Sequence, residues 1–82
     1  SGISPSKLEN PDVVAFKLLE IFFKNNPKMI EDVYDIPFKE LDDEILERIA
    51  MQWKFLLKGN TPDPRRAAIK VLEDWHLGKI KL

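Results

Sequence analysis

The residues most able to do chemistry in this chain are cations in its second half: Lys54, Lys58, Arg65, Arg66, Lys70, Lys79 and Lys81. Residues 1–47 hold five cations and eleven acids, a net charge of −6, whereas residues 48–82 hold eight cations and three acids, a net charge of +5. Segregated charge lets one face of a near-neutral protein meet a polyanion. The pattern therefore predicts a phosphate-binding surface. The alternative is that each half simply carries its own solvated charges.

The pair Arg65-Arg66 has an electrostatically unfavourable place. It follows Asp63-Pro64, which is typical of a helix start, and cations at a helix N-terminus oppose the helix dipole. Free backbone N–H groups at the helix start, together with two guanidinium groups, would suit a phosphate group. The alternative is that either arginine pairs with Asp63 or with an acid of another helix.

Nucleotide binding by this chain itself finds no support in its sequence. Gly2, Gly59 and Gly78 are the only glycines, so neither a G-x-x-x-x-G-K-[ST] phosphate loop nor another glycine-rich cradle is present. With one histidine, His76, and no cysteine, the chain cannot form a histidine cluster or a thiolate metal site. We interpret His76 as a surface or capping imidazole.

Two further sets of residues have a structural explanation that is simpler than a catalytic one. The acids Asp42, Asp43 and Glu44 crowd a predicted helix start, where capping explains them better than metal binding or acid–base work. Trp53 and Trp75 lie on apolar stripes, so we interpret them as core anchors rather than base-stacking platforms. We therefore expect a non-catalytic chain without a metal or cofactor of its own.

Length and composition predict one small domain. The chain has 82 residues, 44% of them hydrophobic and 33% charged, and no cysteine, which suits a reducing cytoplasm. No apolar run approaches the roughly 20 residues of a membrane span, so we expect no membrane partner. Ser1-Gly2, without an initiator Met, is typical of a protease-cleavage remnant from recombinant expression. We expect residues 1–9 to be this remnant and a linker, and residues 10–82 to be a single helical domain.

Proline and asparagine divide the first half of that domain into helices. Asn10-Pro11 predicts an N-capped helix start, and the helix should run to about Asn25, with apolar residues around most of its circumference, as the most buried helix. Pro27 ends it, and a short second helix follows from about Lys28 to Val33 or Tyr34. Phe38 and Leu41, in the next loop, should reach the core.

The second half predicts two longer helices. The third should be capped by Asp42 or Asp43 and carry an apolar stripe of Ile45, Ile49, Trp53 and Leu56 or Leu57. Lys58 should lie near its end, with Gly59 as the left-handed residue beyond. The fourth should run from Pro64 to about Leu77, where Gly78 stops it. We expect Ala68, Val71, Leu72 and Trp75 to face inward, and Arg66, Lys70, Glu73, Asp74 and Leu77 to face outward.

No segment alternates with period two, so we expect no sheet. The predicted fold class is all-α: a compact bundle of three main helices and one short helix.

From about residue 8 to residue 80 the sequence resembles the C-terminal helical domain of the circularly permuted GTPases of ribosome assembly, the ribosome biogenesis GTPase A family. The matching features are Asp12-Val13-Val14-Ala15 with Leu18-Leu19, Pro27 followed by Tyr34, Ile49-Ala50, and a run of Lys58-Gly59, Pro62-Asp63, Arg66-Ala67-Ala68, Leu72-x-Asp74 and Gly78-Lys79. The chain departs from the family pattern at three places. It has Gly59-Asn60 where such domains tend to have Gly-Gly, and a glycine that is common late in their third helix is replaced around Lys54. His76 stands where such domains usually have a cation two residues before the terminal glycine.

The resemblance implies an RNA-binding module that follows a GTP-binding domain and helps it engage ribosomal RNA of the large subunit in the cytoplasm. Such domains are similar to helical antitermination domains that bind RNA. The GTPase motifs, and with them GTP and magnesium, would belong to a domain upstream of Ser1. Arg66 and Lys79 fall on positions of the family motif, as does Asp63, which we interpret as an N-cap. The other cations enter through charge alone.

A protein–protein module is the alternative function. The domain would then dock on its own GTPase domain or on a ribosomal protein through an exposed apolar patch around Leu77 and Ile80. Salt-dependent binding to structured RNA distinguishes the two functions.

We predict that the isolated chain neither binds nor hydrolyses GTP or GDP, because nothing in it can cradle a phosphate chain and magnesium. Isothermal titration calorimetry should give no saturable heat with either nucleotide. Saturable binding would show that a phosphate site exists without a glycine-rich loop.

Overall fold

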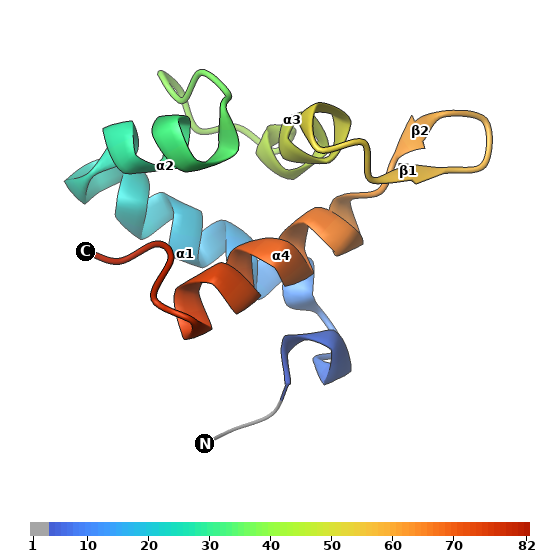
Figure 1. Ribbon diagram of the computed structural model, residues 1–82, viewed down its shortest axis with the longest axis horizontal. Coiled ribbons are helices and arrows are strands. Elements are labelled where there is room, and N and C mark those ends of the chain that lie inside the picture. Colours follow the sequence, from blue (N-terminus) through green and yellow to red (C-terminus); the bar gives the residue numbers. More distant parts are fainter. Residues whose placement is uncertain (1–3) are drawn as a thin grey trace.

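The computed structural model describes residues 4–82, which form four helices and one small β-ribbon (Figure 1). The elements in chain order are the 3₁₀ turn η1 (Pro5–Lys7), α1 (Pro11–Asn25), α2 (Pro27–Tyr34), α3 (Ile45–Gln52), β1 (Leu56–Leu57), β2 (Thr61–Pro62) and α4 (Pro64–His76). The all-α class is confirmed. Helix α3 has 8 residues, as α2 has, so two helices rather than three are long. The predicted remnant Ser1-Gly2 lies outside the described residues.

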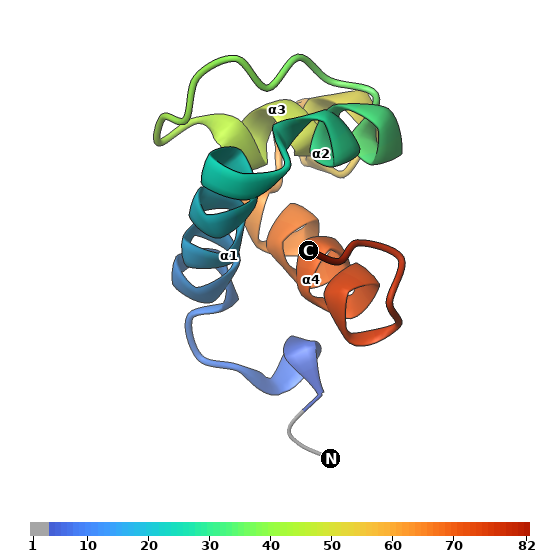
Figure 2. The same cartoon turned by 90° about the vertical axis from the view of Figure 1, so that its left-hand side faces the viewer.

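Helix α4 organises the core, because it packs against both α1 and α3. Figures 1 and 2 both show α2 and α3 together on one side of the α1–α4 pair. The fully or nearly fully buried apolar side chains are Ala15, Leu19, Phe22, Ile30, Tyr34, Ile36, Phe38, Ile45, Leu46, Ile49, Ala50, Ala67, Ala68, Val71, Leu72 and Ile80. Leu8 and Leu41 pack against this cluster from the loops, as predicted for Leu41.

Three helices begin with proline, whose missing N–H costs nothing in the first turn. The cap predicted for Asp63 is confirmed, since its carboxylate accepts the N–H of Arg66 at 3.3 Å. Asn10 is the N-cap residue of α1, as predicted, but the predicted side-chain cap bond is absent. Helix α1 ends at Asn25 as predicted, and α2 begins at Pro27, one residue earlier than predicted.

The third helix differs from the prediction at both ends. Glu44, rather than Asp42 or Asp43, is its N-cap residue, and it makes no side-chain cap bond. The helix stops at Gln52, well before Lys58, because Lys54 adopts the left-handed conformation with φ of 59°. The N–H of Phe55 reaches the carbonyl of Ala50 at 2.8 Å.

The N–H of Lys54 also bonds the carbonyl of Met51, at 3.2 Å. These two bonds form a Schellman motif with lysine in the place that glycine usually takes.

The residues after Phe55 form a hairpin instead of helix. Leu56 pairs with Pro62 and Leu57 with Thr61 in an antiparallel register, so the expectation of no sheet is wrong for this one pair of strands. The turn is closed by the N–H of Asn60 on the carbonyl of Leu57 at 3.1 Å. Gly59, with φ of 82°, serves this turn and not a helix end. Leu56 and Leu57 are consequently exposed.

Helix α1 is less enclosed than predicted, because Val13, Val14 and Ile21 are exposed, 52%, 45% and 45% respectively. Only one face of the helix, centred on Ala15, Leu19 and Phe22, meets the rest of the core. A helix with apolar residues all round therefore leaves part of them at the surface of so small a bundle.

Helix α4 ends at His76 and presents the predicted Ala68, Val71 and Leu72 inward. Two of its residues are reversed relative to the prediction. Asp74 is buried, 3% exposed, because it has bonding partners inside the protein, and Trp75 is 42% exposed. No helix in residues 4–82 is long and apolar enough to cross a membrane.

We predict that Asp63→Ala lowers the free energy of unfolding by about 0.5–2 kcal/mol, because the N–H of Arg66 loses its acceptor. Chemical denaturation followed by circular dichroism measures the change. Asn10→Ala is the matched control, and it should have a smaller effect since Asn10 makes no cap bond. Equal effects of the two substitutions would contradict the assigned cap.

We also predict that Lys54→Gly stabilises the fold by about 0.5–1 kcal/mol, because glycine adopts a left-handed conformation without the steric cost of a side chain. Lys58→Gly is the control. Lys58 has no positive φ, so the extra backbone freedom of glycine in the unfolded chain should lower the stability of this variant slightly. A loss of stability in Lys54→Gly would show that the lysine side chain itself stabilises this turn.

Candidate nucleic-acid interface

A buried carboxylate, that of Asp74, joins three parts of the protein. It accepts a hydrogen bond from the hydroxyl of Tyr34 on α2 at 2.8 Å. The Nζ of Lys70, one turn earlier on α4, lies 3.4 Å from the same carboxylate oxygen. The backbone carbonyl of Asp74 accepts the N–H of Lys79 at 2.8 Å and that of Ile80 at 3.4 Å, which turns the C-terminal segment back onto the core.

Trp53 completes this cluster at the end of α3. Its indole N–H donates to the carbonyl of Tyr34 at 3.0 Å, and the Nζ of Lys70 lies 4.3 Å from the centre of its ring. Trp53 is 39% exposed, so the prediction of a core anchor is wrong. Because the indole has a polar N–H and an electron-rich face, it bridges the core and a surface cation instead. Trp75 also stays partly exposed and meets Phe22 edge to face.

Lys70 is consequently held in place and does not simply point outward as predicted. Its side chain is 23% exposed, between the Asp74 carboxylate and the Trp53 ring. An ammonium group in this position stabilises a carboxylate that is taken out of water. Lys70 is thus both a structural partner and a cation at the edge of the surface.

Arg66 has a similar aromatic partner. Its guanidinium carbon lies 4.5 Å from the centre of the Phe55 ring, and its side chain is exposed. Phe55 directly follows Lys54, and Lys58 lies in the hairpin loop of the same segment. The structure therefore brings four predicted cations to the α3–α4 junction, by which we mean residues 53–63 and the first half of α4: Lys54, Lys58, Arg66 and Lys70.

The side chains of the other three predicted cations do not join this group, although Arg65 lies in the same turn of α4 as Arg66. The guanidinium of Arg65 is directed at the backbone carbonyls of Leu8 and Glu9, each at 3.4 Å, so the two arginines have different neighbours. Within residues 4–82 Arg66 forms no ion pair with Asp63, and its guanidinium lies over the Phe55 ring instead. Lys79 and Lys81 follow α4 at its opposite end from Arg66, and both are exposed.

Sequence reasoning missed the Tyr34–Asp74 bond and the aromatic partners of the cations. The spacing of Lys70 and Asp74, four residues apart on one helix, was the available signal, because such pairs are neighbours on a helix face. Nothing in the sequence marks Tyr34, 40 residues away, as the other partner.

The acids before α3 have structural partners. The Asp42 carboxylate accepts bonds from Arg48 at 2.8 and 3.0 Å and from the N–H of Glu44 at 3.0 Å. The hydrogen bond from Arg48 holds the pKa of Asp42 below its usual value. In residues 4–82 no group of three or more His, Asp or Glu side chains is arranged to hold a metal ion. His76 lies exposed in the last turn of α4.

The apolar patch predicted around Leu77 and Ile80 does not form. Leu77 is 66% exposed, but Ile80 is fully buried because its N–H is held by the carbonyl of Asp74 and its side chain joins the core. A docking surface at this end of the protein would therefore consist of Leu77 without Ile80.

Comparison with known proteins shows a similarity to part of a GTP-binding protein. A curated GTP-binding protein of Methanocaldococcus jannaschii, described as uncharacterized, is 28% identical over 74 residues. The match covers 90% of this chain and 20% of that protein, so the chain spans about a fifth of its relative. No protein-family model and no solved structure matches the chain. The helical bundle is thus similar to one part of a GTP-binding protein.

We predict that Tyr34→Phe lowers the free energy of unfolding by about 1–3 kcal/mol, because the buried Asp74 carboxylate loses a donor. Lys70→Met should cost a similar amount, and Lys79→Met, an exposed cation whose side chain has no partner in residues 4–82, should cost little. Urea denaturation measures all three. An unchanged midpoint in Tyr34→Phe would show that water replaces the hydroxyl.

The same substitution should change the stability at alkaline pH. Burial, and then the bond to Asp74 and its charge, raise the pKa of Tyr34 above its ordinary value of about 10. The unfolded chain therefore releases this proton first, and the stability that Tyr34 contributes is lost as the pH rises beyond about 10. The Tyr34→Phe variant should lose less stability than the wild type between pH 9 and pH 11.

Proposed function

We propose that this chain is an RNA-binding module of a ribosome-assembly GTPase, which helps a GTP-binding domain elsewhere in the parent protein to engage large-subunit ribosomal RNA. The similarity to a part of a GTP-binding protein supports the connection to a GTPase. The sequence resemblance supports the ribosomal assignment. The chain itself would be non-catalytic, and GTP and magnesium would belong to the other domain.

The observation that carries RNA binding is the set of cations at the α3–α4 junction. Arg66 on Phe55 and Lys70 on Trp53 combine a positive charge with an aromatic ring that is partly exposed. Proteins that bind single-stranded or splayed RNA use this combination, because cations neutralise phosphates and aromatic faces stack with bases. Lys54 and Lys58 add charge on the adjoining segment.

The helix start at Asp63 places Arg66 in the first turn of α4, at the positive end of the helix dipole. The cation–ring contact holds the guanidinium near this end of the helix in spite of the helix dipole. A bound phosphate would offset the repulsion between the guanidinium and the helix dipole, because the anion meets both the guanidinium and the positive end of the helix.

We predict that Lys58→Gln combined with Arg66→Gln weakens binding to large-subunit ribosomal RNA and flattens the dependence of log K on log salt concentration. Each lost phosphate contact should change that slope by about 0.7–0.9, because fewer counterions are released. Fluorescence anisotropy with labelled fragments of the RNA, over a series of salt concentrations, measures both effects.

Lys24→Gln combined with Lys39→Gln is the matched control. Both lysines are exposed, belong to the acidic half of the chain and have no side-chain partner in residues 4–82, so the control makes the same change in net charge. Lys70 stays unchanged in these variants, because its removal would destabilise Asp74. Equal losses in the two double variants, or an unchanged slope in the first, would remove the α3–α4 junction from the RNA site.

A further inference from the structure

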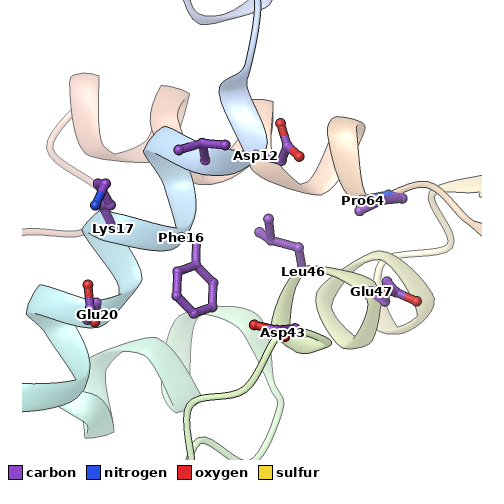
Figure 3. Close-up of a pocket in the computed structure, with 9 residues that line it drawn as sticks. Asp12, Phe16, Lys17, Glu20, Asp43, Leu46, Glu47 and Pro64 are labelled. Carbon is purple, nitrogen blue, oxygen red and sulfur yellow. The ribbon is translucent and has the colours of Figure 1, made fainter.

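A groove of about 470 Å³ lies between α1 and α3, and its floor is apolar. Figure 3 shows the Phe16 ring directed from α1 into this space and the Leu46 side chain directed into it from α3. Val13 also lines the groove and is 52% exposed, although it is a large apolar residue. The groove therefore offers apolar surface that the fold of this chain does not cover.

Carboxylates surround this floor. Asp12 and Glu20 come from α1, Asp43 comes from the loop before α3, and Glu47 comes from the first turn of α3, whereas Lys17 is the only cation among the lining residues. Among residues 4–82, no side chain donates a hydrogen bond or forms an ion pair to any of these four acids.

The neighbouring Asp42, in contrast, is fully engaged with Arg48. The helix dipole accounts for Asp12 and Glu47, which lie in first turns, but not for Glu20 in the middle of α1.

We propose that this groove binds a basic segment of a partner protein, with an apolar side chain seated on Phe16 and Leu46 and with Lys or Arg residues facing the four carboxylates. The charge of the rim selects this occupant. Nucleic acid would be repelled by the same carboxylates, and a purely apolar segment would leave them without compensation. The apolar floor supplies contact area that a simple counterion would not use.

The site is separate in chemistry from the proposed RNA surface. The α3–α4 junction presents cations from the basic second half of the sequence. The groove presents acids, all of them from the acidic first half. The groove would thus let the domain hold a basic protein segment while the cations remain available.

The experiment uses three synthetic peptides of equal length with the ¹⁵N-labelled 82-residue chain. The first is amphipathic, with Leu on one face and Lys on the other; the second keeps the Leu residues and has Glu in place of Lys; the third keeps the Lys residues and has Ser in place of Leu. Titration at low salt should shift the backbone resonances of Val13, Phe16 and Leu46 with the first peptide. The Glu peptide should not bind, and the Ser peptide should bind more weakly.

Charge-reversal variants locate the site. Glu47→Lys should lower the affinity for the Lys–Leu peptide about fivefold, because the substitution removes an exposed ion pair and reverses the charge. Glu73→Lys is the matched control, since it makes the same charge change at an exposed position on α4 that does not line the groove, and it should leave the affinity nearly unchanged. Val13→Ser should also weaken binding, without unfolding the chain, because the residue is half exposed.

Four results would overturn the proposal. Resonance shifts centred outside the groove, or equal losses in Glu47→Lys and Glu73→Lys, would show nonspecific attraction. Dimerisation of the chain that Glu47→Lys abolishes, measured by analytical ultracentrifugation without peptide, would assign the groove to a second copy. Shifts of the Val13, Phe16 and Leu46 resonances on titration with RNA alone, without peptide, would assign the groove to nucleic acid. RNA affinity of Glu47→Lys, measured in parallel, keeps this test independent of the proposed function.

Discussion

The carboxylate of Asp74 has to remain inside the protein with its charge compensated, and much of the arrangement follows from that requirement. A buried carboxylate is costly unless it is hydrogen-bonded and paired. Tyr34 supplies the hydrogen bond from α2, and Lys70 supplies the positive charge from α4. The Asp74 main chain receives the C-terminal segment, which seats Ile80 in the core. One residue therefore fixes how α2, α4 and the C-terminal segment meet.

Lys70 connects the buried Asp74 carboxylate to the surface of the protein. Because its ammonium is held beside Asp74, it lies over the Trp53 ring, and the indole N–H in turn bonds the carbonyl of Tyr34. Trp53 is the last residue before Lys54 turns the chain out of α3. The direction of the α3–α4 junction is thus connected to the buried carboxylate. A cationic surface on such a support is ordered before a ligand arrives, which lowers the entropic cost of binding.

The two proposed surfaces have opposite chemistry because the sequence separates its charges. Acids of the first half line the groove between α1 and α3, and cations of the second half occupy the α3–α4 junction. In a domain this small, residues close in sequence supply most of each surface. A module of this kind would suit a protein that brings RNA and a basic protein segment together, since each ligand is repelled from the site of the other.

Local signals in the sequence were enough to predict most helix boundaries. Pro11, Pro27 and Asp63-Pro64 start helices, and Gly78 follows the last one, because these residues restrict or release the backbone wherever they occur. The apolar spacing also predicted most of the core, including Phe38 in its loop. The candidate cations were visible from their residue types alone.

The tertiary structure decided what depends on partners distant in the sequence. From the sequence, a charged residue at position 74 of a helix is predicted to be exposed. Only the hydroxyl of Tyr34, which α2 places next to it, makes the burial of Asp74 favourable. The apolar stripe through Trp53 to Leu57 continues the α3 pattern, yet the helix stops at Gln52. Lys54 takes a left-handed conformation that its side chain disfavours, and the bond from Phe55 to Ala50 and the packing of Phe55 on the core hold it there. Local preference sets where a helix can begin, but packing energy determines where this one ends and which charges it can bury.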